Sequence, residues 1–144
     1  MTRRRPLLLA GAVALLCRPA RATPTSLQTA ITAFTGGAAV RDGRVRLDIA
    51  PLVENGNAVP VSLGVEGTEP GGVRRLALFN EQNPQPDVAV FRLGALVGRA
   101  QVSTRMRLAT SQTVVALAEL ADGSFWQHRV EVVVTLAACV EGES

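Results

Sequence analysis

The chain has 144 residues, of which 15 are basic, 12 are acidic and one is histidine, so its formal net charge is +3. All of the basic residues are arginines, and five of them lie within the first 22 residues. Without that segment, ten arginines face twelve acidic residues, a net charge of about −2, so the charge does not support a nucleic-acid partner.

Residues 1–22 are typical of an export signal. Residues 3–5 are all arginine and precede the apolar run 7–16, which is too short to span a bilayer but fits a signal-peptide core. The paired arginines indicate a twin-arginine signal, and small residues predict cleavage after Ala22. We therefore expect a periplasmic protein. The residue before Cys17 is too large for lipoprotein cleavage, so we expect no stable membrane anchor.

The first predicted element of the mature chain is a helix. About 122 residues remain after cleavage, enough for one domain with one core, which we assign to residues 23–136. Apolar residues recur at helical spacing in 26–34, and Gly36 and Gly37 follow. This pattern predicts a short amphipathic helix that lies on the domain.

The period of the apolar residues then changes to two, which is typical of strands. Seven short runs, separated by turn-forming residues, follow this pattern: 44–49, 59–65, 73–79, 88–93, 101–108, 113–119 and 125–136. They predict an all-β domain, an immunoglobulin-like antiparallel β-sandwich. Asp122 and Gly123 form the strongest hairpin signal, whereas 54–57 and 83–86 are interpreted as turns or stiff loops.

The single histidine, His128, limits the chemistry of the chain. Zinc sites need three or four ligands, and a blue-copper site needs two histidines with a cysteine, so His128, Met106 and Cys139 supply neither. A cysteine hydrolase needs a base beside its thiol, but His128 lies about eleven residues before Cys139 on the same strand and arm. We expect an exposed, non-functional His128, no catalytic residue, no metal site and no cofactor.

Arginines on the run 101–108 form a second polar feature. Arg105 and Arg107 share one face of this predicted strand, opposite Met106 and Leu108. A solvated outer face is the simplest interpretation, and a docking surface for anionic groups is the alternative.

The tail 137–144 carries the one thiol of the mature chain, Cys139. A free cysteine is often buried, but a terminus with two carboxylates and a glycine usually frays, which favours an exposed Cys139. In an oxidising compartment, a single thiol is buried, joined to another chain or loaded with a group. We therefore expect an arm that presents Cys139.

Several segments together resemble the SoxY family, the sulfur-carrier subunits of the periplasmic thiosulfate-oxidising system. They occur in the same order along the mature chain: 54–61, 83–86, 102–109, 111–112 and 122–124. The resemblance implies that Cys139 covalently holds sulfur intermediates and presents them to periplasmic sulfur-oxidising enzymes. It also implies a SoxZ-like sandwich subunit as the partner in a heterodimer.

The arm departs from the family pattern. SoxY proteins place the cysteine among glycines, whereas here it lies in Ala137-Ala138-Cys139-Val140-Glu141, similar to a SoxY-related group with the arm Ala-Ala-Cys-Ile-Glu. Alanine and valine narrow the backbone options, so a tunnel shaped for glycine admits this arm less easily. Glu141 near the thiol disfavours the thiolate, which suits a carrier that is loaded by an enzyme.

The sequence therefore predicts a non-enzymatic sulfur carrier. The alternative is a periplasmic immunoglobulin-like adaptor that uses Cys139 for an intermolecular disulfide or for packing. A cysteine-dependent hydrolase or transferase is the third hypothesis, and it is disfavoured because no base is near the thiol.

Overall fold

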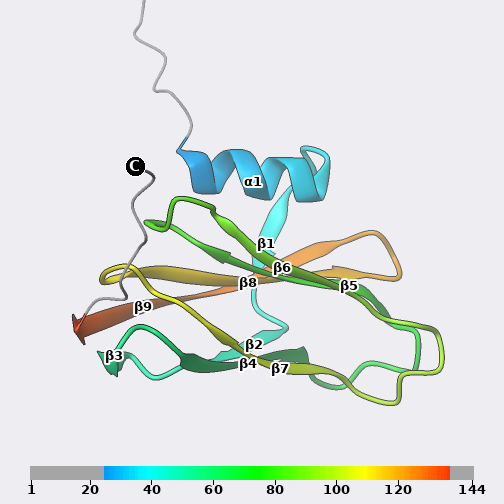
Figure 1. Ribbon diagram of the computed structural model, residues 1–144. Coiled ribbons are helices and arrows are strands. Elements are labelled where there is room, and N and C mark those ends of the chain that lie inside the picture. Colours follow the sequence, from blue (N-terminus) through cyan, green and yellow to red (C-terminus); the bar gives the residue numbers. More distant parts are fainter. Residues whose placement is uncertain (1–24, 137–144) are drawn as a thin grey trace, which may run out of the picture.

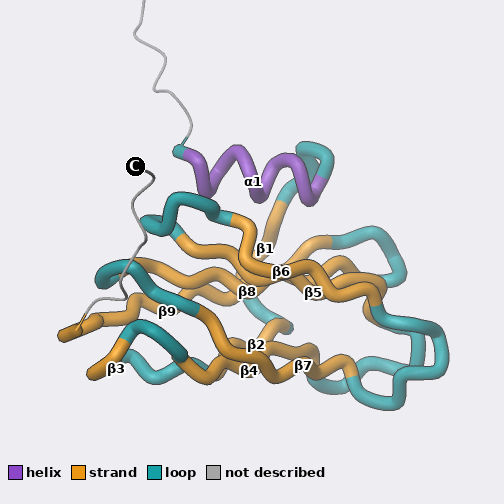
Figure 2. Tube along the Cα trace, viewed as in Figure 1, coloured by secondary structure: helices purple, strands orange, loops and turns teal. Residues whose placement is uncertain are grey.

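The computed structural model describes residues 25–136, which form one helix and nine strands (Figures 1 and 2). In chain order these are α1 (Ser26–Thr35), β1 (Val40–Asp42), β2 (Val45–Asp48), β3 (Leu52–Asn55), β4 (Val59–Val65), β5 (Val73–Asn80), β6 (Asp87–Arg92), β7 (Ala100–Met106), β8 (Gln112–Leu120) and β9 (Phe125–Leu136). The predicted signal at 1–22 and the arm at 137–144 lie outside the described residues. No helix in the described range is long and apolar enough to cross a bilayer.

The strands form two facing sheets. The larger has the order β1-β9-β8-β5-β6, with β3 also paired to β9, and the smaller has the order β2-β4-β7. Only β1 and β3 run parallel to their partner among the described pairs; all the others are antiparallel. The predicted immunoglobulin-like β-sandwich with a short helix is confirmed, and all seven predicted strands are present.

Both faces of the larger sheet are covered at its centre. On β5, Leu76 and Leu78 join the core between the sheets, whereas Ala77 and Phe79 join a second cluster under α1. Side chains alternate between the faces of a strand, so one run of buried residues serves both clusters. Figure 1 shows the result, with α1 above the larger sheet and β2, β4 and β7 below it.

Helix α1 has the predicted position and ends. Thr25 caps its start by accepting a hydrogen bond from an N–H of the first turn. Gly36 ends it in the left-handed region, at φ 66°, which glycine adopts without strain. The apolar face is buried through Leu27, Ile31 and Phe34, so the amphipathic pattern places the helix on the sheet.

Phe34 and Arg75 fix the end of α1 to the sheet. The Phe34 ring meets Phe79 and Phe125 edge to face, at centroid distances of 5.9 and 6.0 Å. The Arg75 guanidinium lies 4.1 Å from the centroid of the Phe34 ring and donates to its carbonyl oxygen at 3.1 Å. Arg75 also forms an ion pair with Glu119 on β8. The helix is therefore bound by aromatic packing and by charge.

Two strands, β1 and β3, are not among the predicted ones. Each is only three or four residues long and pairs with β9 from a distant part of the chain. The prediction of a turn at 54–57 is correct only in part. Glu54 and Asn55 end β3, and the turn follows at Gly56 and Asn57, where the Asn57 N–H donates to Asn55 Oδ1 at 3.0 Å.

The predicted hairpin at Asp122 and Gly123 is confirmed as the connection between β8 and β9. Gly123 has a φ of 84°, which favours glycine. The Ser124 N–H and hydroxyl both donate to Asp122 Oδ1, and these bonds lower the pKa of Asp122. These hydrogen bonds within the turn stabilise its conformation.

Replacing Phe34 with alanine should lower the free energy of unfolding by about 3 kcal/mol, because a buried ring is lost between two aromatic neighbours. Urea unfolding followed by Trp126 fluorescence measures this change. Leu96→Ala is the control, since that side chain is 98% exposed and its loss should change the value by less than about 0.5 kcal/mol. Equal losses in the two variants would contradict the proposed anchoring of α1.

Candidate functional site

Strand β9 leads the chain towards the cysteine arm, and both of its edges are held close to its end. Along one edge β8 pairs with it as far as Val132, opposite Gln112. Beyond that point Ser111 bonds to the same edge of β9, since the Val134 N–H donates to Ser111 Oγ at 2.8 Å. Along the other edge β3 pairs with it as far as Leu136.

The turn after β3 holds the last residue of β9. The Gly56 N–H donates to the Leu136 carbonyl at 2.9 Å, and the Gly56 carbonyl accepts from the Leu108 N–H at 2.8 Å. The Thr135 hydroxyl donates to the Glu54 carbonyl at 3.2 Å. The chain is therefore fixed up to Leu136, three residues before Cys139.

Asn83 joins the neighbouring loops to this end of the sandwich. Its Oδ1 accepts from the Ala109 N–H at 3.0 Å and from Gln112 Nε2 at 2.7 Å, and its Nδ2 donates to the Arg107 carbonyl at 2.8 Å. The Oε1 atom of the buried Gln112 accepts from the Gln82 N–H at 2.9 Å. We call Gly56, Asn83, Ser111 and Gln112 the arm-base network.

Four segments that carry the sequence resemblance contribute to this network or contact it. They are 54–61, 83–86, 102–109 and 111–112. The sequence interpretation treated 54–57 and 83–86 as ordinary turn chemistry and missed their shared position. The available signal was the set of amide and hydroxyl side chains in short loops, but only the fold brings those loops together.

The predicted attachment residue, Cys139, lies outside the described residues. The same holds for the arm residues Ala137, Ala138, Val140 and Glu141. The sequence separation still limits the reach of the thiol, because three residues span at most about 10 Å when extended. Wherever the arm lies, Cys139 stays within that distance of Leu136.

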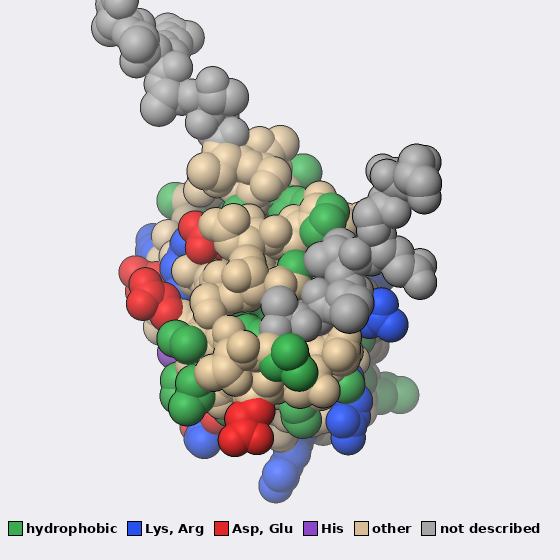
Figure 3. Space-filling view, turned by 60° about the vertical axis from the view of Figure 1, so that its left-hand side comes forward, with side chains coloured by type: hydrophobic (Ala, Val, Ile, Leu, Met, Phe, Trp, Pro, Cys, Tyr) green, Lys and Arg blue, Asp and Glu red, His purple; other side chains and the backbone are tan. Residues whose placement is uncertain are grey.

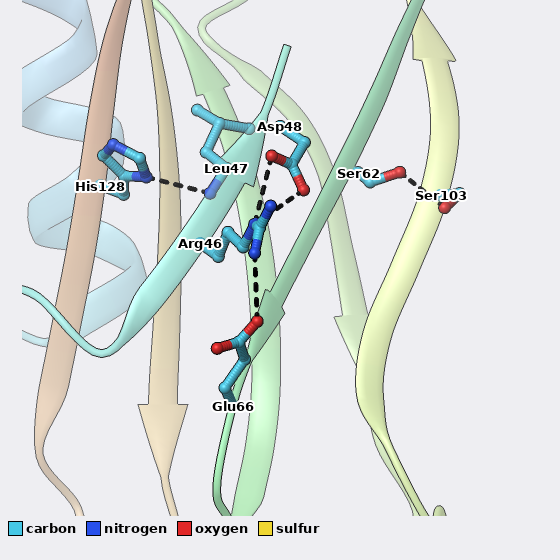
Figure 4. A network of polar contacts seen from close by, with 7 residues as sticks. All are labelled: Arg46, Leu47, Asp48, Ser62, Glu66, Ser103 and His128. Atoms are coloured by element: carbon cyan, nitrogen blue, oxygen red, sulfur yellow. Dashed lines mark hydrogen bonds and ion pairs between the residues drawn. The ribbon is translucent and has the colours of Figure 1, made fainter.

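His128 is half-buried, so the expectation of an exposed histidine is wrong. Its Nδ1 accepts a hydrogen bond from the Leu47 N–H at 3.0 Å (Figure 4). Leu47 lies on β2 of the smaller sheet and His128 on β9 of the larger one, so the bond links the two sheets. It also satisfies a backbone donor on the edge of β2 that faces away from β4.

Among the described residues, no group of three or more His, Cys, Asp or Glu could hold a metal ion.

A groove of about 560 Å³ runs along the smaller sheet. At its wall Arg46 donates to the Asp48 carboxylate at 3.0 and 3.2 Å and to Glu66 at 3.3 Å (Figure 4). The hydrogen bond and charge of Asp48, followed by those of Glu66, raise the pKa of Arg46. The groove borders Val65 at one end of β4, whereas the arm-base network lies beyond Val59 at the other end. Its charges are largely paired within the domain.

The predicted outer face of the run 101–108 is confirmed. Arg105 and Arg107 are exposed, whereas Met106 and Leu108 are buried in the core between the sheets. These arginines therefore lie on the surface of the smaller sheet and close to its edge.

The described residues at this end of the sandwich form a rigid base for the end of β9. The family model of the sulfur oxidation protein SoxY matches residues 31–139. The chain therefore belongs to the SoxY family, which classes it with carrier proteins and not with enzymes. The match ends at Cys139.

Among solved structures, the chain is similar to the sulfur carrier protein SoxY from Chlorobium limicola f thiosulfatophilum. The two are 27% identical with a TM-score of 0.65, and the match covers 76% of this chain and 91% of that one. No curated protein matches the chain.

Superoxide reductases have a similar fold. The protein from Ignicoccus hospitalis is 17% identical with a TM-score of 0.55, covering 62% of this chain and 78% of that one. The protein from Nanoarchaeum equitans is 12% identical with a TM-score of 0.54, covering 65% of this chain and all of that one. These identities show a shared fold alone.

Replacing Asn83 with alanine should lower the free energy of unfolding by about 2 kcal/mol, because three hydrogen bonds to Ala109, Gln112 and Arg107 are lost. Urea unfolding measures the loss, and hydrogen exchange should speed up at the Ala109 amide. Asn57→Ala is the matched control, since its side chain is exposed and only its backbone N–H bonds in the turn. If both variants unfold alike, Asn83 does not hold the arm base.

Proposed function

We propose that this protein is a periplasmic sulfur carrier of the thiosulfate-oxidation type, in which Cys139 covalently holds sulfur intermediates. The twin-arginine pattern and the cleavage position in 1–22 support export. Membership in the SoxY family supports the carrier role, and the family match extends as far as Cys139. The observation that carries the proposal is the fixed end of β9 at Leu136, three residues before the only thiol of the mature chain.

A fixed base and a short arm suit presentation of a bound group. Because Leu136 is held from both sides, the backbone of Cys139 can lie no farther than about 10 Å from a fixed point. Ala137, Ala138 and Val140 restrict the arm further than glycines would. Less freedom is then lost when an enzyme takes up the arm, which lowers the entropic cost of binding.

The chemistry divides between the carrier and its enzymes. Joining the outer sulfur of thiosulfate to Cys139 forms a sulfur–sulfur bond and releases the thiol proton and two electrons. A partner enzyme must pass those electrons to an acceptor, while the carrier supplies the thiol. Glu141 keeps the thiol a mild nucleophile, so loading depends on the enzyme.

A SoxZ-type subunit is the partner that family membership supports in general. We propose that the two sandwiches form a heterodimer through an open sheet edge. β6 is an edge strand of the larger sheet and β7 of the smaller one, whereas on the outer edge of β2 the Leu47 N–H is already bonded to His128. Such edges expose backbone groups that pair readily with another strand.

Intact mass of the protein purified without reductant from thiosulfate-oxidising cells should show a sulfur-containing adduct, and Cys139→Ser should abolish it. The serine variant is a matched control, because it removes one sulfur and retains the size of the side chain. The same spectrum should show a chain that begins after Ala22.

Two results would count against the carrier. One is an unmodified thiol under turnover conditions. The other is a stable cross-linked dimer on non-reducing electrophoresis with no adduct, which would favour an adaptor that uses Cys139 as a disulfide.

A further inference from the structure

The surface at the end of β9 exposes apolar side chains. Leu52 is 61% exposed and Val133 52%, and we call these two residues the arm-base patch. Leu136, also exposed, ends β9 three residues after Val133, so its side chain leaves the opposite face of the strand. Leu52 and Val133 are partners in the parallel pairing of β3 with β9, so their side chains lie side by side. Figure 3 shows this end of the molecule, with hydrophobic side chains among acidic and basic ones.

No other element of the described structure covers the patch. Helix α1 covers the opposite end of β9, where Phe125 joins its cluster. On the outer face beside the patch, Glu54 and Glu131 are exposed, and neither belongs to an ion pair among the described residues. The patch is therefore apolar with acidic neighbours.

The short arm determines where a partner must lie. The backbone of Cys139, three residues beyond Leu136, reaches at most about 10 Å from it, and its side chain extends little further. An enzyme that acts on Cys139 in a recessed site must bring its entrance within this distance of Leu136. The rim of that entrance then contacts the side chains around Leu136, and on the outer face of β9 these include the arm-base patch.

We propose that the arm-base patch is the docking surface for the enzyme that loads Cys139, an inference that rests on the proposed carrier function. The complementary rim carries apolar side chains facing Leu52 and Val133 and basic groups facing Glu54 and Glu131. A permanently bound subunit on this surface would block access to the arm. A patch of two side chains also fits a transient encounter better than a permanent interface, which is larger and more hydrophobic.

The double variant Leu52→Thr with Val133→Thr tests this surface, because threonine retains strand propensity and removes apolar contact. Loading is measured by intact mass with thiosulfate, an extract of thiosulfate-grown cells and ferricyanide, which accepts the two electrons; boiled extract gives the background. The initial rate should fall about tenfold, since two apolar contacts are weakened at the centre of the interface. Leu96→Thr, an exposed leucine in the β6–β7 loop at the other end of the sandwich, should load at the unchanged rate.

Alkylation of Cys139 by N-ethylmaleimide separates docking from reactivity. This reagent adds directly to the thiol and needs no protein surface, so the double variant should react at the unchanged rate. A second variant, Glu54→Arg with Glu131→Arg, leaves the patch in place and should slow enzymatic loading most at low ionic strength, because it reverses the charge facing the rim.

Unchanged loading of the threonine variant would overturn the inference. So would loss of its association with the SoxZ-type subunit in size-exclusion chromatography, because the patch would then be the subunit interface. Absence of loading on the unaltered protein would instead overturn the proposed carrier function and the docking surface with it.

Discussion

The structure depends on the pairing of β9 along both edges. β8 holds one edge, while β1 and β3 hold the two ends of the other. Between them His128 accepts the Leu47 N–H and links β9 to the smaller sheet. One strand thus connects the sheets and carries the chain to Leu136. Because its last residues are held by backbone hydrogen bonds, the position at which the arm begins is set by the sandwich.

The rest of the domain makes this strand rigid. β5 and β8 bury both of their faces, one against the smaller sheet and one against α1. Arg75 secures α1 through Phe34 and Glu119, so the outer layer is not held by apolar burial alone. The body formed in this way holds β9 in place as far as Leu136. The position from which the tail continues is therefore fixed by the sandwich.

Superoxide reductases share the fold of this chain, so the sandwich alone does not define the chemistry of a protein that contains it. In this chain the ring of the one histidine accepts a hydrogen bond from a backbone N–H. The described residues hold no group of three or more His, Cys, Asp or Glu that could bind a metal ion. The features that point to a carrier lie instead at one end of the sandwich. There the arm-base network holds the backbone of Leu136, and the arm-base patch lies on the outer face of the same end of β9.

The sequence by itself determined the local elements and the family. Helical spacing in 26–34, the period of two in seven runs and the Asp122-Gly123 turn each depend on neighbours in the chain, and the family resemblance pointed to Cys139. Only the tertiary structure decided β1, β3, the half-buried His128 and the arm-base network. The physical reason is that each of these depends on hydrogen bonds between residues far apart in the chain. The local sequence pattern does not identify such partners.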